Sequence, residues 1–120
     1  MLVIDAANVI GSRPTGWWRD RPAAARDFTA RIRDAVTDGR LDAPLIIVLE
    51  GRSREGADEA VVDGVEVVHA AGEGDDTIAV LAGRHRGSVV VTADRELARR
   101  VRAVDAEVVG PSWLLDRVSS

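Results

Sequence analysis

The chain of 120 residues contains no cysteine and no lysine. The lack of cysteine excludes disulfide bonds and any zinc site or nucleophile that depends on a thiolate. The lack of lysine excludes a P-loop nucleotide-binding motif. No run of about 18 apolar residues occurs, so no membrane span is expected, and no secretory signal is visible after Met1. We therefore expect a cytoplasmic protein that has no contact with a membrane.

The charge balance is slightly acidic. The net charge is −4, and all 16 basic residues are arginines. Bulk charge therefore gives no general attraction to nucleic acid, which counts against a passive nucleic-acid coat. It does not count against an enzyme, because metals neutralise the carboxylates of a metal site. The length and the hydrophobic content of 46% suit a single domain over residues 1–120.

Short apolar runs alternate with helical patterns along the chain. Strands are predicted at Leu2–Asp5, Leu45–Leu49, Val65–His69, Ser88–Val91 and Glu107–Val109. Helices are predicted at Arg21–Asp38 and from Asp75, Asp94 and Pro111 onward, and residues 52–59 are expected to form a loop. This alternation predicts an α/β three-layer sandwich with a mostly parallel five-stranded sheet.

Acidic residues follow several of the predicted strands. Asp5 ends the first strand, Glu50 closes the second, Asp75 and Asp76 come after the third, and Asp94 comes after the fourth. The carboxyl ends of parallel strands share one edge of a sheet, where ligands bind. Carboxylates gathered there repel each other, and bound hard cations are the commonest reason for such a cluster. All five are therefore candidate ligands for Mg²⁺ or Mn²⁺.

Structural explanations compete with this interpretation. Asp75 and Asp94 could simply cap the helices that follow them. No helix clearly begins at Asp5, so capping explains that residue less well. Asn8 could orient a ligand, a water or a phosphate oxygen without adding charge, and His69 is a weaker candidate for a base.

Arginines flank two adjacent tryptophans in the segment after the first strand, which contains Arg13, Trp17, Trp18, Arg19 and Arg21. Guanidinium groups bind phosphate and indole faces stack on bases, so this segment is a candidate nucleic-acid clamp. The alternative is that one or both tryptophans close the core. Arg52 and Arg54 could add phosphate contacts, or could instead pair with Glu50.

Three segments together resemble the signature segments of the NYN domain. They are Asp5-Ala6-Ala7-Asn8, residues 74–78 and residues 91–97, and their order and spacing are most similar to the bacterial YacP-like branch. The resemblance covers nearly the whole chain. It implies a fold similar to PIN-domain nucleases with strand order 3-2-1-4-5, which brings the first and fourth strands together.

The same resemblance implies roles for particular residues. Metal-ligand roles fall on Asp5, Asp75 and Asp94, with Asp76 as an auxiliary acid and Asn8 at the family's asparagine position. One departure is Glu50, which stands where the family often has an aspartate.

We expect a ribonuclease that hydrolyses RNA phosphodiester bonds with Mg²⁺ or Mn²⁺, using Asp5, Asn8, Asp75 and Asp94 in catalysis. The alternatives are a non-catalytic RNA- or protein-binding module and a nucleotide pyrophosphohydrolase. A haloacid-dehalogenase-like phosphatase is excluded because position 7 is alanine, and a phosphoacceptor receiver domain is excluded because its lysine is missing. The sequence leaves open whether the RNA is single-stranded or structured, whether one or two metals bind, and whether the chain forms a homodimer.

Overall fold

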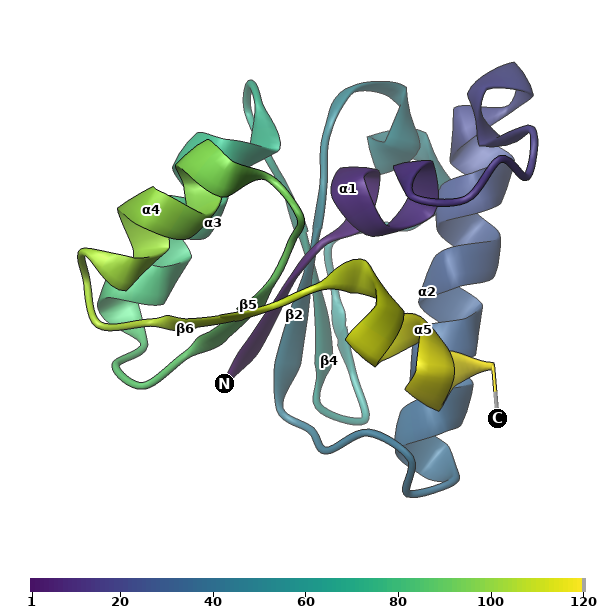
Figure 1. The fold of residues 1–120 in the computed structure, drawn as a ribbon. Helices are drawn as coiled ribbons and strands as arrows, with labels where there is room; N and C mark the ends of the chain where they lie inside the picture. The colour runs from purple at the N-terminus through teal and green to yellow at the C-terminus, as the bar shows by residue number, and fades with distance from the viewer. Residues whose placement is uncertain (120) are drawn as a thin grey trace.

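The computed structural model describes residues 1–119 and consists of one sheet with helices on both faces (Figure 1). The strands are β1 (Leu2–Asp5), β2 (Leu45–Leu49), β3 (Val61–Val62), β4 (Val65–His69), β5 (Val89–Val91) and β6 (Glu107–Val109). The α-helices are α1 (Ala6–Gly11), α2 (Arg21–Thr37), α3 (Gly74–Arg84), α4 (Arg95–Arg102) and α5 (Pro111–Val118). Two 3₁₀ helices complete the chain, η1 (Trp17–Arg19) and η2 (Gly51–Gly56).

The sheet has six strands in the order β3-β4-β2-β1-β5-β6. The prediction of five strands in the order 3-2-1-4-5 is therefore wrong in strand count, and the observed order differs from it by one added edge strand. The difference is β3, a two-residue edge strand that pairs antiparallel to β4. Asp63 and Gly64 join β3 to β4 with φ angles of 52° and 79°, which suits the tight turn of a two-residue hairpin.

The parallel strands reverse their order beside β1. β1 pairs with β2 on one side and with β5 on the other, parallel in both cases. After β1 the chain builds outward through β2 and β4, and it then returns to place β5 against β1. Such a reversal opens a crevice at the carboxyl ends of the two strands, which is where parallel α/β sheets bind ligands. The crevice here is at the ends of β1 and β5.

Two cores fill the space between the layers. Helices α1, α2 and α5 cover one face of the sheet, and α3 and α4 cover the other (Figure 1). All five residues of β2 are buried, because a central parallel strand is covered on both faces. Helix α2 begins where Asp20 accepts a hydrogen bond from the Ala23 amide at 3.0 Å, a usual start for a helix. No helix within residues 1–119 combines the length and the apolar character that crossing a bilayer demands.

Three local expectations were wrong. Helix α1 follows β1 directly, with Asp5 as its N-cap, although no helix was expected there. Helix α3 has Glu73 at its N-cap position, so Asp75 lies inside the first turn and does not cap it. Much of the expected loop at 52–59 is the 3₁₀ helix η2. By contrast, Asp94 caps α4 as predicted.

Candidate functional site

Asp5 lies at the centre of the crevice between β1 and β5. The residue is only 8% exposed, because it ends a strand that is covered on both faces. Oδ1 accepts a hydrogen bond from the Asn8 amide at 3.3 Å, in the first turn of α1. Oδ2 accepts a hydrogen bond from the Thr92 hydroxyl at 2.9 Å. The carboxylate is therefore held from the segments that follow both strands of the crevice, α1 after β1 and Thr92 after β5.

Thr92 connects Asp5 to Asp94. The Thr92 hydroxyl donates to Asp5 and accepts a hydrogen bond from the Asp94 amide at 3.1 Å. Oδ1 of Asp94 accepts from the Leu97 amide at 3.0 Å, which begins α4. The sequence did not single out Thr92 as a site residue. Its signal is a polar residue directly after the apolar run Val89–Val91, and that residue is 2% exposed in the fold.

Asn8 holds the other side of the crevice. Its side-chain oxygen accepts a hydrogen bond from the Ala93 amide at 2.7 Å. This contact and the contact between Asp5 and Thr92 tie α1 to the loop after β5. The side-chain oxygen of Asn8 thus helps to hold the crevice together. The side-chain NH₂ group is the part of Asn8 that is left to contact a ligand.

The crevice disfavours ionisation of Asp5. The pKa of Asp5 is raised to about 6, mainly by burial and also by the nearby carboxylates of Glu50 and Asp75, while the hydrogen bonds from Thr92 and Asn8 oppose the rise. Burial has the largest effect, because a charge loses hydration in the interior. The influence of Glu50 and Asp75 also shows that the fold brings these two acids electrostatically close to Asp5.

The other acidic residues of this edge differ in their surroundings. Glu50 accepts a hydrogen bond from the Gly74 amide at 3.2 Å, at the start of α3. The alternative pairing of Glu50 with Arg52 or Arg54 is not found, because Arg52 pairs with Glu55 and Arg54 donates to backbone carbonyls. Asp75 is partly buried in the first turn of α3. Asp76 is exposed and forms an ion pair of 3.0 Å with Arg100 of α4.

The donor set at this edge consists of oxygen atoms, which are the ligands that Mg²⁺ and Mn²⁺ prefer. Within residues 1–119, however, no three acidic or histidine side chains lie close enough to one another to hold a metal ion together. Mg²⁺ in proteins is often bound by only one or two carboxylates, with waters and substrate phosphates as its other ligands. The chemistry of the donor set therefore fits these ions, but as a site that substrate and water complete.

The arginine and tryptophan side chains of residues 13–21 form two separate pairs. The Arg21 guanidinium lies 5.4 Å from the centre of the Trp17 ring, and the Arg19 guanidinium lies 5.9 Å from the centre of the Trp18 ring. The two indoles meet edge to face with their ring centres 6.0 Å apart. Trp17 is partly buried, whereas Trp18 is 52% exposed. Neither tryptophan belongs to the buried core.

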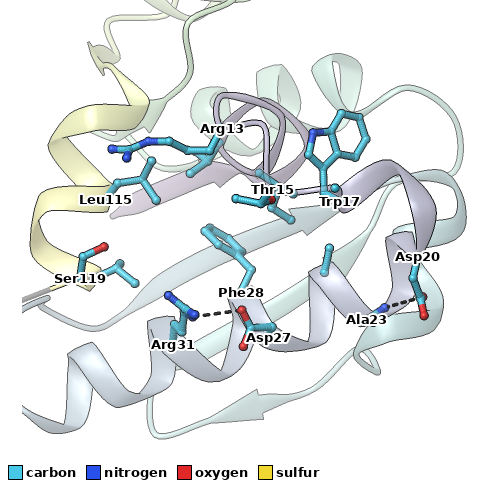
Figure 2. A pocket seen from close by; sticks show the side chains of 15 residues that line it. Arg13, Thr15, Trp17, Asp20, Ala23, Asp27, Phe28, Arg31, Leu115 and Ser119 are labelled. Atoms are coloured by element: carbon cyan, nitrogen blue, oxygen red, sulfur yellow. Dashed lines mark hydrogen bonds and ion pairs between the residues drawn. The ribbon is translucent and has the colours of Figure 1, made fainter.

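Two cavities meet at Trp17. The larger, about 440 Å³, lies between α1, α2 and α5, and Arg13 lines it (Figure 2). Figure 2 shows Phe28 rising from α2 in the middle of this cavity, Arg13 beside Leu115, and the Trp17 ring turned away from Phe28. The smaller, about 280 Å³, lies between α1, the start of α2 and η2, and Glu50 and Arg21 line it. The predicted clamp is therefore divided, because Arg13 and Arg21 line different cavities.

His69 is held by the loop before β3. Nε2 of its ring donates to the Ala57 carbonyl at 2.7 Å, and its backbone amide donates to the Glu59 carboxylate at 2.9 Å. Arg52, Arg54 and His69 line a shallow depression beside η2. This depression lies at the ends of β2 and β4, and its lining includes none of the residues of the crevice at Asp5.

Comparison with known proteins gave one kind of match. No protein-family model matches the chain, and no curated protein sequence matches it. Among solved structures, the fold is similar to a crystal structure of Rae1 (YacP) from Bacillus subtilis, determined as a tryptophan-to-leucine variant, with a TM-score of 0.75. The similarity covers 98% of this chain and 74% of that chain, at 19% sequence identity. At this identity the likeness shows a shared fold, and that fold is the one found in YacP.

Proposed function

We propose that the chain is a metal-dependent ribonuclease whose active site is the crevice between β1 and β5. The observation that carries the proposal is the buried Asp5 carboxylate, which lies near Glu50 and Asp75 and has no cationic side chain as a partner within residues 1–119. A buried charge is normally paired or bound to a metal. The resemblance of three sequence segments to the YacP-like branch and the fold likeness to YacP support the same activity.

Asp5 and Asp94 would hold the metal from β1 and from the loop after β5, with water and substrate as its other ligands. Asp75 would add negative charge from the first turn of α3, which favours a cation here. A bound Mg²⁺ or Mn²⁺ supplies charge that polarises a phosphodiester and lowers the pKa of water. Thr92 fixes the orientation of the Asp5 carboxylate, and Asn8 keeps α1 against the loop after β5. Together they hold the acids in place before substrate arrives, which lowers the cost of binding.

One observation favours a second function. Since no three acids within residues 1–119 are close enough to hold a metal as they stand, a non-catalytic module that binds RNA would also fit this fold. In that case Asp5 would bind no metal. Its carboxyl, with a pKa of about 6, would take up a proton at mildly acidic pH and have only a structural role.

The test is cleavage of single-stranded RNA with Mn²⁺ or Mg²⁺, compared with a chelator. Asp5→Asn keeps the shape of the side chain and removes the charge, so it should abolish cleavage. Asp42→Asn is the matched control, because Asp42 is exposed and lines a cavity at the opposite end of the sheet with Met1 and Leu2. Cleavage that survives in both Asp5→Asn and Asp94→Asn would contradict the proposal. Hydrolysis of nucleotide pyrophosphates in preference to RNA would point to the pyrophosphohydrolase instead.

A further inference from the structure

The two tryptophan–arginine pairs occupy different environments. Trp17 and Arg21 both line the smaller cavity, and this cavity also includes Glu50, which lies close enough to Asp5 to raise its pKa. Trp18 is 52% exposed, and Trp18 and Arg19 line neither cavity beside Trp17. Only the first pair therefore forms part of a concave surface next to the proposed active site.

The lining of the smaller cavity is mostly apolar. Ala7 and Ile10 contribute one wall from α1, and Ala24 contributes another from α2. The Trp17 indole and the Arg21 guanidinium supply flat surfaces of the kind on which nucleobases stack. An apolar lining with a few polar groups is typical of a small-molecule or base pocket. The volume of about 280 Å³ is near the lower end of ligand pockets, roughly 300–1,000 Å³.

Close backbone contacts hold the walls in place. A Cβ atom at Gly56 would lie 2.3 Å from the carbonyl oxygen of Pro22, so η2 is packed directly against the start of α2. A Cβ atom at Gly11 would lie 3.6 Å from the Trp17 ring, which places the indole against the end of α1. The cavity is thus formed between elements that already touch, and a ligand would not need to open it.

We propose that this cavity binds one unpaired nucleobase of an RNA strand whose phosphate backbone passes the crevice at Asp5. The base packs against Trp17 and Arg21, and the small side chain of Ala7 leaves room for it. The inference rests on the proposed function, since it takes RNA as the substrate. The small volume admits one base and no base pair, so the cavity selects single-stranded RNA at this position.

The larger cavity does not suit this role. Of its two arginines, Arg13 and Arg31, Arg31 is already paired with Asp27 at 3.0 Å. Its lining also includes none of the acids of the crevice. The smaller cavity, which Glu50 lines, is therefore the one that adjoins the crevice.

Tryptophan fluorescence separates the two indoles. Variants that keep one tryptophan each, with phenylalanine at the other two positions, are titrated with a short single-stranded RNA in Ca²⁺. The same RNA is then used with its bases removed. We expect saturable quenching of Trp17 by the intact RNA, little quenching by the RNA without bases, and little response from Trp18 or Trp113. Quenching of Trp18 with none of Trp17 would overturn the proposal.

Affinity measurements provide a second test. Trp17→Ala should weaken binding of single-stranded RNA by about 5- to 150-fold, the usual effect of losing one base stack, whereas Trp18→Ala should change it by less than about twofold. Trp17→Ala could also disturb α1, so Ala7→Leu serves as an independent variant. It keeps Trp17 and fills the cavity, and Ala7 is exposed, so folding should be little affected.

Ala23→Leu is the matched control for Ala7→Leu, because Ala23 lines only the larger cavity. Normal RNA affinity in Ala7→Leu, or equal loss in both leucine variants, would overturn the base site. Metal-dependent cleavage with no contribution from Trp17 or Ala7 would overturn the base site and leave the ribonuclease intact. Binding that depends on Trp17 and Ala7 without any cleavage would support the base site and contradict the ribonuclease. Failure to bind any RNA would overturn the base site too.

Discussion

Asp5 and Asp76 are acidic residues at the same edge of the sheet, but they differ in burial and in the partners of their carboxylates. Asp5 is 8% exposed and accepts hydrogen bonds from both sides of the crevice. The side chain of Asp76 is 83% exposed and pairs with Arg100. The pKa of Asp5 is raised to about 6 by burial. Position at a strand's carboxyl end therefore does not by itself make an acid part of a site.

The difference comes from the elements that carry the two residues. Asp5 ends a central strand, so helices cover it on both sides. Asp76 lies in the first turn of α3, one residue after Asp75. Successive residues on a helix point about 100° apart, so the two acids cannot both face Asp5. Asp75 influences the pKa of Asp5, and Asp76 turns toward α4. The predictions below test this contrast.

The largest expected effect is on the pH dependence of stability. The pKa of Asp5 is about 6 in the folded chain, against 3.8 for an unperturbed aspartate, so the folded state binds the proton more tightly. The proton on Asp5 therefore stabilises the folded chain. Its contribution to the free energy of unfolding is complete below about pH 4 and is lost as pH rises through about 6, a change of about 3 kcal/mol. In metal-free buffer, Asp5→Asn should therefore become more stable relative to the natural chain as pH rises from 4 to 8. Urea unfolding at several pH values measures the difference.

Other carboxyls also titrate in this range, so the comparison needs a control. Asp42→Asn changes an exposed acid and should show a stability difference from the natural chain that hardly varies with pH. If the Asp5→Asn difference were equally flat, the raised pKa of Asp5 would be wrong.

A bound metal ion should offset the repulsion between the carboxylates of Asp5, Glu50 and Asp75. A ligand that binds only the folded form stabilises it by about 2.7 kcal/mol at a concentration 100 times its Kd. We expect Mn²⁺ to raise the Tm of the natural chain, and Asp94→Asn to reduce that rise. Asparagine is as good an N-cap as aspartate, so α4 should remain intact in this variant. Calorimetry that detects no Mn²⁺ binding by the natural chain would rule out the metal site.

Removal of the Thr92 hydroxyl should have a somewhat smaller effect. Thr92→Val has almost the same shape, but it leaves Asp5 Oδ2 and the Asp94 amide without their partner. An unsatisfied buried group costs about 1–3 kcal/mol. Because the Thr92 hydrogen bond lowers the pKa of Asp5, the valine variant should also shift the pH midpoint upward. Thr92→Ser keeps the hydroxyl and should retain that midpoint, and an unchanged midpoint in the valine variant would argue against the link between the two residues.

The strands were largely readable from the sequence because their signals are local and strong. The run Leu45–Leu49 is continuously apolar, as a strand buried on both faces must be. The hairpin at β3 was missed although Asp63-Gly64 is a strong turn signal, because a two-residue strand is too short to show alternation. Helix α1 was missed for another reason. It has six residues, among them Asn8, Val9 and Gly11, which are weak helix formers, and packing against α2 and β2 is what stabilises it.

The site could be predicted only in part. The sequence placed Asp5 and Asp94 at strand ends, and the parallel pairing of β1 with β5 brings those ends together. The hydrogen bonds from Thr92 to Asp5 and from Ala93 to Asn8 join residues 87 and 85 positions apart, and no local pattern indicates such contacts. The division of Arg13 and Arg21 between two cavities is likewise a result of how α1, α2 and α5 pack.

The smallest effect is expected at Asp76, the other member of the comparison. Its ion pair with Arg100 joins side chains that are 83% and 35% exposed, and such surface pairs contribute less than about 1 kcal/mol. Asp76→Asn should therefore change the free energy of unfolding very little, and it should leave the rise in Tm with Mn²⁺ unchanged, because the carboxylate is directed at α4. Thermal unfolding with and without Mn²⁺ measures both quantities. Arg100→Gln removes the same ion pair and leaves the acid in place, so it is the matched control. If Asp76→Asn reduced the Mn²⁺ effect as strongly as Asp94→Asn while Arg100→Gln did not, Asp76 would turn toward the metal when it binds, and the contrast with Asp5 would apply only to the metal-free protein.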